Sequence, residues 1–140
     1  MTADNLFSVF AVSGSGLDAY TTWLNAVSDN VANANDVSPT SGPAFQARYV
    51  VAQAVNGGPD GAGAGVAVTG IALGSAAGVE VSDPSSPLAD ANGLVREPAV
   101  DMGEQMSNMM MAQRGYEMNL AVIGKAEAAY QAALTIGQNA

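Results

Sequence analysis

The chain has 140 residues, a net charge of −9 and neither cysteine nor histidine, so it has room for about one domain. The missing residue types exclude disulfide bridges, thiol and imidazole catalysis, and zinc sites built from cysteine and histidine. Only four basic residues oppose 13 acidic ones, which argues against binding to nucleic acid or to an anionic membrane.

The low charge content carries more information than the net charge. Charged residues make up 12% of the chain, against roughly 25% in an ordinary soluble domain. We therefore favour a chain that buries its surface against neighbours, although a bias towards alanine and glycine is the simpler alternative. Residues 1–10 lack the basic segment and apolar run of a cleavable signal peptide, so export would need another route.

The first predicted element is a helix whose apolar residues recur at alternating spacings of four and three, the rhythm of a coiled-coil seam. Gly14 and Gly16 each cost about 1 kcal/mol relative to alanine inside a helix, so we expect the helix to be kinked or frayed there, or to start near Leu17. The helix should end within residues 30–36, which are rich in Asn and Asp. The seam consists of Leu6, Phe10, Ser13, Leu17, Tyr20, Leu24, Val27 and Val31.

The middle of the chain is typical of strands and loops. Residues 45–55 are rich in β-branched and aromatic side chains and predict a strand, and residues 66–71 predict a second one. Five glycines within residues 57–65 indicate a flexible loop between them. Residues 79–81 predict a short third strand, and residues 82–93 are turn-rich.

A second, longer helix is predicted over residues 102–137, with a length of about 54 Å at 1.5 Å per residue. Such a helix needs a long partner, and the first helix is the obvious one; the pairing would be antiparallel because the chain returns from the middle segment. Ordinary bundle packing without a polymer explains both stripes equally well. Gln113 and Glu127 either set the register or mark where the seam drifts off the face. The seam consists of Met102, Met106, Met109, Gln113, Tyr116, Leu120, Ile123, Glu127, Tyr130 and Leu134.

The predicted fold class is mainly α with a small β-rich insertion, built on an antiparallel, coiled-coil-like pair of long N- and C-terminal helices. Residues 1–42 and 99–140 would form the helical domain, and residues 43–98 the insertion. Met109, Met110 and Met111 suit an adaptable contact surface or plain core filling equally well.

Candidates for chemistry are weak. Asp83, Asp90, Glu97 and Asp101 could in principle hydrolyse a glycosidic bond, but they lie in a loop rich in Pro and Gly and are better read as solvated turn residues. Residues 90–93 match only part of a calcium loop. We therefore predict no catalytic residue, no metal ligand and no cofactor.

Three segments carry a resemblance to a known family. The segment SDNVANANDVSP at residues 28–39 resembles the N-terminal motif of flagellar rod and hook proteins, and QRGYEMN at residues 113–119 resembles their C-terminal signature. Between them, DPSSPLADANGLV at residues 83–95 is similar to a segment of a proximal-rod subunit. The chain is identified as a member of the flagellar basal-body rod protein family over nearly its whole length. The residues that match the two terminal motifs are Asn30, Ala32, Asn33, Asn35, Arg114, Tyr116, Glu117 and Asn119.

This resemblance implies a structural subunit of the proximal rod, which polymerises through its terminal helices into a torque-transmitting shaft across the periplasm. It implies export by the flagellar type III apparatus without a cleaved signal. The implied partners are further copies of the chain, other proximal-rod, adapter and distal-rod subunits, and the export apparatus, with no nucleic acid and no membrane insertion.

Specific roles follow for several residues. Asn30, Asn33 and Asn35 should cap the first helix and hydrogen-bond adjacent backbone, and Arg114 should fix register through Glu117 or a neighbour's acid. The apolar side chains expected to pack in the helix pair and against neighbours are Leu6, Phe10, Leu17, Leu24, Val27, Val31, Met106, Met109, Tyr116, Leu120, Ile123, Tyr130 and Leu134. The alternatives are another short axial or adapter protein of a type III export system, a soluble helical binding module, and, as a third class, an enzyme acting on peptidoglycan.

Overall fold

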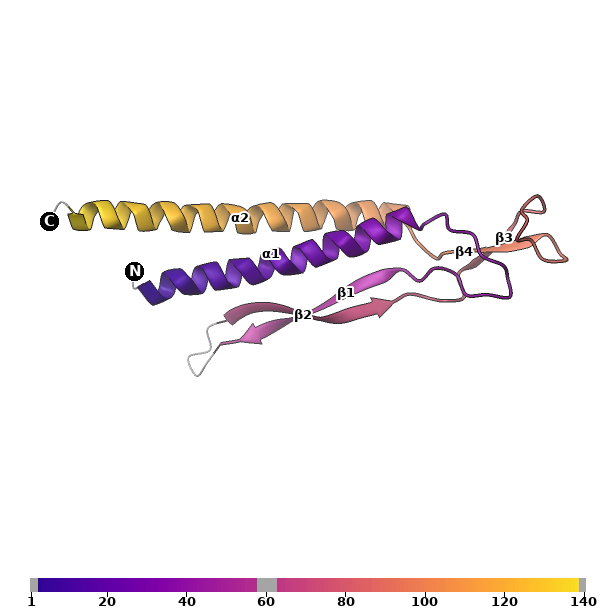
Figure 1. The fold of residues 1–140 in the computed structure, drawn as a ribbon, viewed down its shortest axis with the longest axis horizontal. Helices are drawn as coiled ribbons and strands as arrows, with labels where there is room; N and C mark the ends of the chain where they lie inside the picture. Colours follow the sequence, from indigo (N-terminus) through magenta and orange to yellow (C-terminus); the bar gives the residue numbers. More distant parts are fainter. Residues whose placement is uncertain (1–2, 58–62, 139–140) are drawn as a thin grey trace. The chain divides into compact units, whose positions relative to one another are not determined.

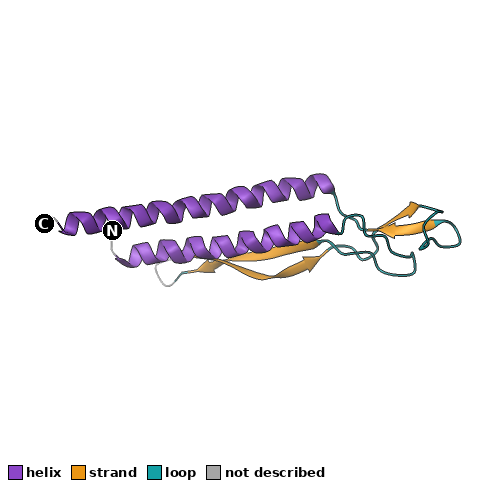
Figure 2. Cartoon of the chain, turned by 45° about the horizontal axis from the view of Figure 1, so that its top comes forward, coloured by secondary structure: helices purple, strands orange, loops and turns teal. Residues whose placement is uncertain are grey.

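A computed structural model describes residues 3–57 and 63–138, and two long helices account for most of that part of the chain (Figure 1 and Figure 2). The chain is mainly helical with a small β part, which confirms the predicted balance. No helix within the described ranges is long and apolar enough to cross a membrane. In chain order the elements are α1 (Ala3–Ala32), β1 (Arg48–Asn56), β2 (Gly63–Leu73), β3 (Val79–Ser82), β4 (Leu94–Glu97) and α2 (Met102–Gln138).

Helix α1 runs without interruption through both of its interior glycines, so the expected start near Leu17 is wrong. A Cβ added to Gly16 would lie 2.8 Å from the side-chain oxygen of Asn119, which shows that a close contact depends on this glycine. A Cβ added to Gly14 would meet no described neighbour within 4 Å. The packing at Gly16 therefore offsets its poor helix propensity, whereas Gly14 is simply tolerated within a long helix.

Both helix ends that border the middle segment are capped by polar side chains. Helix α1 ends at Ala32, inside the predicted range, and the backbone N–H and side-chain amide of Asn33 both donate to the Asp29 carbonyl, at 3.1 and 2.7 Å. Helix α2 begins at the predicted residue, where the Asp101 carboxylate accepts the Glu104 N–H at 3.0 Å. A carboxylate at this N-cap position satisfies a free N–H and suits the helix dipole.

The four strands form two separate two-stranded sheets, β1 with β2 and β3 with β4. Strands β1 and β2 confirm the two strands predicted in the middle segment, whereas residues 58–62 of the predicted glycine-rich loop lie outside the described residues. Strand β3 confirms the third prediction and pairs antiparallel with β4, from Val79 opposite Glu97 to Ser82 opposite Leu94. The sequence did not predict β4, because four residues between a turn and Pro98 are too short for a clear alternation.

The described chain divides into two compact units, and each has its own small core. The first consists of residues 1–22, 52–69 and 111–140, and the second of residues 23–51 and 70–110. Ser13, Ala112 and Ala126 are buried in the first unit. The buried apolar side chains of the second unit are Ala26, Val27, Ala44, Ala47 and Val95.

Most of these core side chains are alanines, so each unit buries little apolar surface of its own. The large apolar side chains are instead found at the surface, and half of the exposed ones belong to α2. A long helix that exposes so many large apolar side chains is typical of a chain that is covered by partners. The exposed ones on α2 are Met102, Met106, Met110, Met111, Met118, Leu120, Val122, Tyr130, Leu134 and Ile136.

Candidate assembly surface

A buried hydrogen-bonded group in the second unit joins the end of α1 to the start of β1 and to the first turn of α2. We call this group, Asn30, Arg48 and Gln105, the Asn30 joint. The Asn30 amide nitrogen donates to the Arg48 carbonyl and to Gln105 Oε1, both at 3.0 Å, and Asn30 Oδ1 accepts the Arg48 N–H at 2.7 Å. Asn30 is 0% exposed and Gln105 1% exposed, so these bonds form away from water.

The same joint also holds the side chain of Arg48. Its guanidinium forms an ion pair with Asp29 at 2.5 Å, next to Asn30 in sequence. Both partners of this ion pair are about half exposed, so it contributes at most about 1 kcal/mol. The buried Asn30 bonds to the Arg48 backbone therefore position the first residue of β1 more firmly than the ion pair does.

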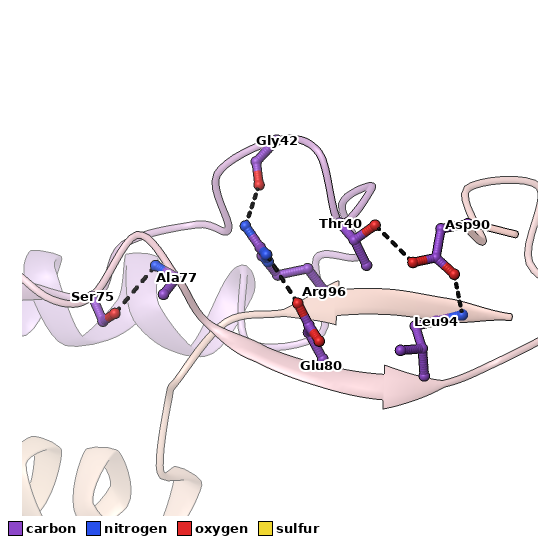
Figure 3. Close-up of polar contacts among 8 residues, drawn as sticks. All are labelled: Thr40, Gly42, Ser75, Ala77, Glu80, Asp90, Leu94 and Arg96. Carbon is purple, nitrogen blue, oxygen red and sulfur yellow. Dashed lines mark hydrogen bonds and ion pairs between the residues drawn. The ribbon is translucent and has the colours of Figure 1, made fainter. Parts of the chain in front are cut away.

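A second polar group in this unit orders the turn-rich segment before β4 (Figure 3). Asp90 Oδ1 accepts the N–H groups of Asn92 and Leu94 at 2.8 and 3.0 Å, while Asp90 Oδ2 accepts the Thr40 hydroxyl at 3.1 Å. The Leu94 N–H first, then the Asn92 N–H, and more weakly the Thr40 hydroxyl, hold the pKa of Asp90 below its usual value. Asp90 is therefore a structural carboxylate that stays ionised.

Arg96 on β4 links three segments of the second unit. Its guanidinium donates to the Gly42 carbonyl at 2.8 Å and pairs with Glu80 on β3 at 3.1 Å (Figure 3). Its backbone N–H and carbonyl both bond to Ser38, each at 2.8 Å. The segment that follows α1 is thus attached to the β3–β4 sheet.

Two of the other carboxylates weighed for chemistry also have local structural roles. Asp83 accepts the Ser85 hydroxyl at 2.7 Å, and Asp101 caps α2 as described above. Within the described residues, no three acidic side chains come together as potential metal ligands. The geometry therefore gives Asp83 and Asp90 roles in turns and Asp101 a role as a helix cap.

In the first unit, α1 and α2 meet through reciprocal close contacts between a glycine of one helix and a larger side chain of the other. Gly16 of α1 faces Asn119 of α2, and Gly115 of α2 faces the ring of Tyr20 on α1. Each of these glycines lies four residues from the larger side chain on its own helix. Helix α1 also holds β2, since the Ser15 hydroxyl accepts the Val66 N–H at 3.1 Å.

The buried side of α2 carries small or polar residues rather than the predicted seam. Gln105, Ala112 and Ala126 are buried, and they lie seven or fourteen residues apart. The predicted positions one residue later, Met106, Gln113 and Glu127, are exposed. Within the chain, buried residues of α2 therefore lie one position before half of the residues of the predicted seam.

The same displacement occurs on α1. Gly16 and Asn30 are buried, whereas Leu17 and Val31, one residue later in each case, are only half-buried. Val27, which belongs to both patterns, is 2% exposed. Large apolar side chains thus flank the buried seam on both helices, where neighbouring molecules can reach them.

The residues that match the terminal family motifs lie in three kinds of environment. The predicted capping role suits Asn33, which bonds to Asp29, but not Asn30, whose amide bonds to Arg48 and Gln105 instead. Asn119 donates to the Gly115 carbonyl at 2.9 Å. No ion pair joins Arg114 to Glu117 among the described residues, and both side chains are exposed. The remaining motif residues are Tyr116, half-buried, and Ala32 and Asn35, exposed.

The predicted packing residues fall mainly into partly covered and exposed groups. The side chain of Leu6 lies outside the described part of the structure. The half-buried group is Phe10, Leu17, Leu24, Val31, Met109, Tyr116 and Ile123. The exposed group is Met106, Leu120, Tyr130 and Leu134. We call this last group the α2 apolar surface.

The three consecutive methionines differ in their exposure to solvent. Met109 is half-buried, whereas Met110 and Met111 are exposed. Within the chain, core filling therefore describes only the first of the three. Flexible thioethers at the surface are typical of adaptable contact regions.

Comparisons with known proteins give consistent relatives. A sequence profile described as "Flagellar basal body rod FlgEFG protein C-terminal" matches residues 91–136. The flagellar basal-body rod protein FlgC of Escherichia coli O6:H1 is 38% identical over 133 residues, which cover 95% of this chain and 98% of that protein. FlgC of Salmonella typhimurium gives the same figures. FlgC of Agrobacterium fabrum is 33% identical over 120 residues, 86% of each chain.

Proposed function

Because the chain belongs to the FlgC family of flagellar basal-body rod proteins, we propose that it is a structural rod subunit that assembles through its two long helices. The function is then the packing itself, with no catalytic step. The observation that carries this proposal is the α2 apolar surface, which the chain's own residues leave exposed.

The α2 apolar surface is large enough to drive association. Leu120, Tyr130 and Leu134 are 47%, 50% and 48% exposed. Burying a large apolar side chain completely contributes about 1.5–3 kcal/mol, so covering the exposed half of each contributes roughly 1 kcal/mol. Such contacts, repeated along a 37-residue helix and around a polymer, would stabilise a stiff shaft.

We further propose that the two terminal helices form one antiparallel, coiled-coil-like pair within the subunit. The contacts of Gly16 with Asn119 and of Tyr20 with Gly115 support this arrangement, because the later of the two α1 residues meets the earlier of the two α2 residues. In this proposal, residues 1–42 and 99–140 form the rod core, and residues 43–98 form an insertion at its side.

The proposed setting follows from the family. The relatives are named as basal-body rod proteins, so we propose that the chain lies in the rod of the basal body. The proposal includes a rod that crosses the periplasm and export of the chain without a cleaved signal. Its partners would be further copies, the other rod and adapter subunits, and the type III export apparatus. The ion pairs of Arg48 and Arg96 with acidic neighbours support the absence of a nucleic-acid partner, because they neutralise two of the chain's four cations.

Replacing Leu120 by aspartate tests the proposal. Because the side chain is half exposed, the isolated chain should keep its helical content, but a carboxylate at a covered interface costs several kcal/mol and should block assembly. We expect loss of swimming in soft agar and loss of the chain from purified basal bodies, at an unchanged cellular level. Tyr116→Asp should act in the same way.

Leu120→Met is the matched control, because it preserves an apolar side chain of similar volume, and it should swim normally. Normal motility of the Leu120→Asp strain would refute assembly through the α2 apolar surface.

A further inference from the structure

Each of the two helices carries a seven-residue series of buried and half-buried residues, which creates a problem of register. A heptad series looks much the same after one helix slides past the other by seven residues, so hydrophobic packing alone does not select one alignment. Helix α2 presents Gln105, Ala112, Asn119 and Ala126, and helix α1 presents Val9, Gly16, Trp23 and Asn30.

The contacts nevertheless agree on one alignment. In each cross-helix contact, the two residue numbers add up to 135 (16 with 119, 20 with 115, 30 with 105). The first two contacts belong to the first unit and the third to the second unit. The two contacts of the first unit therefore report an antiparallel register, and the single contact of the second unit has the same residue sum.

We propose that Asn30 and Gln105 are the register-determining residues of the subunit, which select this alignment of the terminal helices from those that differ by one heptad. The inference rests on the proposed function, in which the two helices form one antiparallel pair. Asn30 and Gln105 would thus select one alignment of the two helices, beyond any contribution to the free energy of unfolding.

The geometry of Asn30 explains why the selection is sharp. Both donors and the acceptor of its amide are used, by Gln105 and by the backbone of Arg48, at 2.7–3.0 Å. A slide of one heptad would set Asn30 opposite Ala112, or opposite Pro98 before α2 begins. The fully buried amide would then lose its Gln105 partner, which strongly disfavours both alternatives.

The environment of Gln105 indicates a role in selecting the helix register rather than in raising the free energy of unfolding. It is 1% exposed, yet its Nε2 has no hydrogen-bond partner among the described residues. A buried amide that is only half satisfied stabilises less than an apolar side chain of similar size would. A polar residue at one seam position is the recognised way in which a helix pair fixes its register at a cost in stability.

Disulfide trapping tests the proposal, because the chain has no cysteine of its own. The native reporter is Gly16→Cys with Asn119→Cys, two positions whose side chains meet. The slipped reporters are Gly16→Cys with Ala112→Cys or with Ala126→Cys. These lie one heptad away, about 10 Å along the helix, which is too far for a disulfide in the native register.

Each reporter is introduced into the full chain, oxidised both after refolding and in purified basal bodies, and scored as the intramolecular disulfide. In the parent chain we expect the native reporter alone to cross-link. In the Asn30→Leu/Gln105→Leu variant we expect at least a tenfold increase in a slipped cross-link, with a melting temperature that is unchanged or higher. The exchange variant Asn30→Gln/Gln105→Asn should restore the native cross-link alone.

Gln113→Leu is the matched control, since it makes the same chemical change at an exposed position of α2 and should leave all reporters unchanged. A leucine pair that still gives only the native cross-link would overturn the proposal, because the glycine contacts would then suffice. If the parent chain gives no native cross-link, the antiparallel pair itself is wrong. That outcome is separate from the assembly test at Leu120.

Discussion

Replacing Gly115 by alanine has two opposite effects on the free energy of unfolding, and the structure allows us to compare their sizes. Alanine is favoured over glycine inside a helix by about 1 kcal/mol, so the substitution should stabilise α2. However, Gly115 is buried, and the new Cβ would run into the ring of Tyr20, with the hydroxyl oxygen only 2.7 Å away. Overpacking of this kind costs about 1–3 kcal/mol, so the clash should cancel or exceed the gain.

Gly124 provides the comparison within the same helix. A Cβ added there meets no described neighbour within 4 Å, so Gly124→Ala should show the helix-propensity gain alone. The two variants should therefore differ by about 1–3 kcal/mol, or roughly 3–10 °C in melting temperature for a chain of this size. Thermal unfolding of the full chain, followed by far-UV circular dichroism, measures the difference.

A second substitution isolates the cause. If the Tyr20 ring is responsible, Gly115→Ala should become stabilising in a Tyr20→Ala background, as a double-mutant cycle would show. If Gly115→Ala stabilises the parent chain as much as Gly124→Ala does, the close approach of the helices at this point is wrong.

Two further predictions concern the second unit. Because the folded state lowers the pKa of Asp90, its stabilising effect is present above the usual value of 3.8 and is lost as the pH falls through the folded-state value. Acid titration should therefore loosen residues 83–95, as measured by proteolysis, and Asp90→Ala should abolish this acid dependence. Gly78 has φ +56° and its added Cβ would strike the Glu97 carbonyl, so Gly78→Ala should destabilise by more than 1 kcal/mol in thermal unfolding. Gly70→Ala, with open space around it, should change stability little, and equal effects would contradict the strain at Gly78.

The sequence predicted the helices and most strands because periodicity and turn residues report local structure directly. The Asn-rich run before Pro39 predicted where α1 ends, and the first residue of the methionine-rich seam predicted where α2 begins. The sequence did not predict β4, because pairing with β3 defines that strand more than its own four residues do.

The predicted seam differs by one position from the buried residues of the helices for a different physical reason. A search for large apolar residues selects Leu17, Val31 and Met106, whereas the helices approach most closely where side chains are small or mutually hydrogen-bonded, as at Gly16 and Asn30. Hydrophobicity alone does not distinguish a buried contact within the chain from a surface kept for neighbours. The Asn30 joint was missed because its partners lie 18 and 75 residues away.

The alanine-rich cores have a consequence for the life of a subunit outside the rod. Side chains this small contribute little apolar burial, so a lone subunit should open often enough for proteases to cleave it. Once neighbours cover the α2 apolar surface, the same chain should resist digestion. Surplus copies would then be cleared while incorporated ones persist, so turnover alone would match the supply of subunits to the number of growing rods.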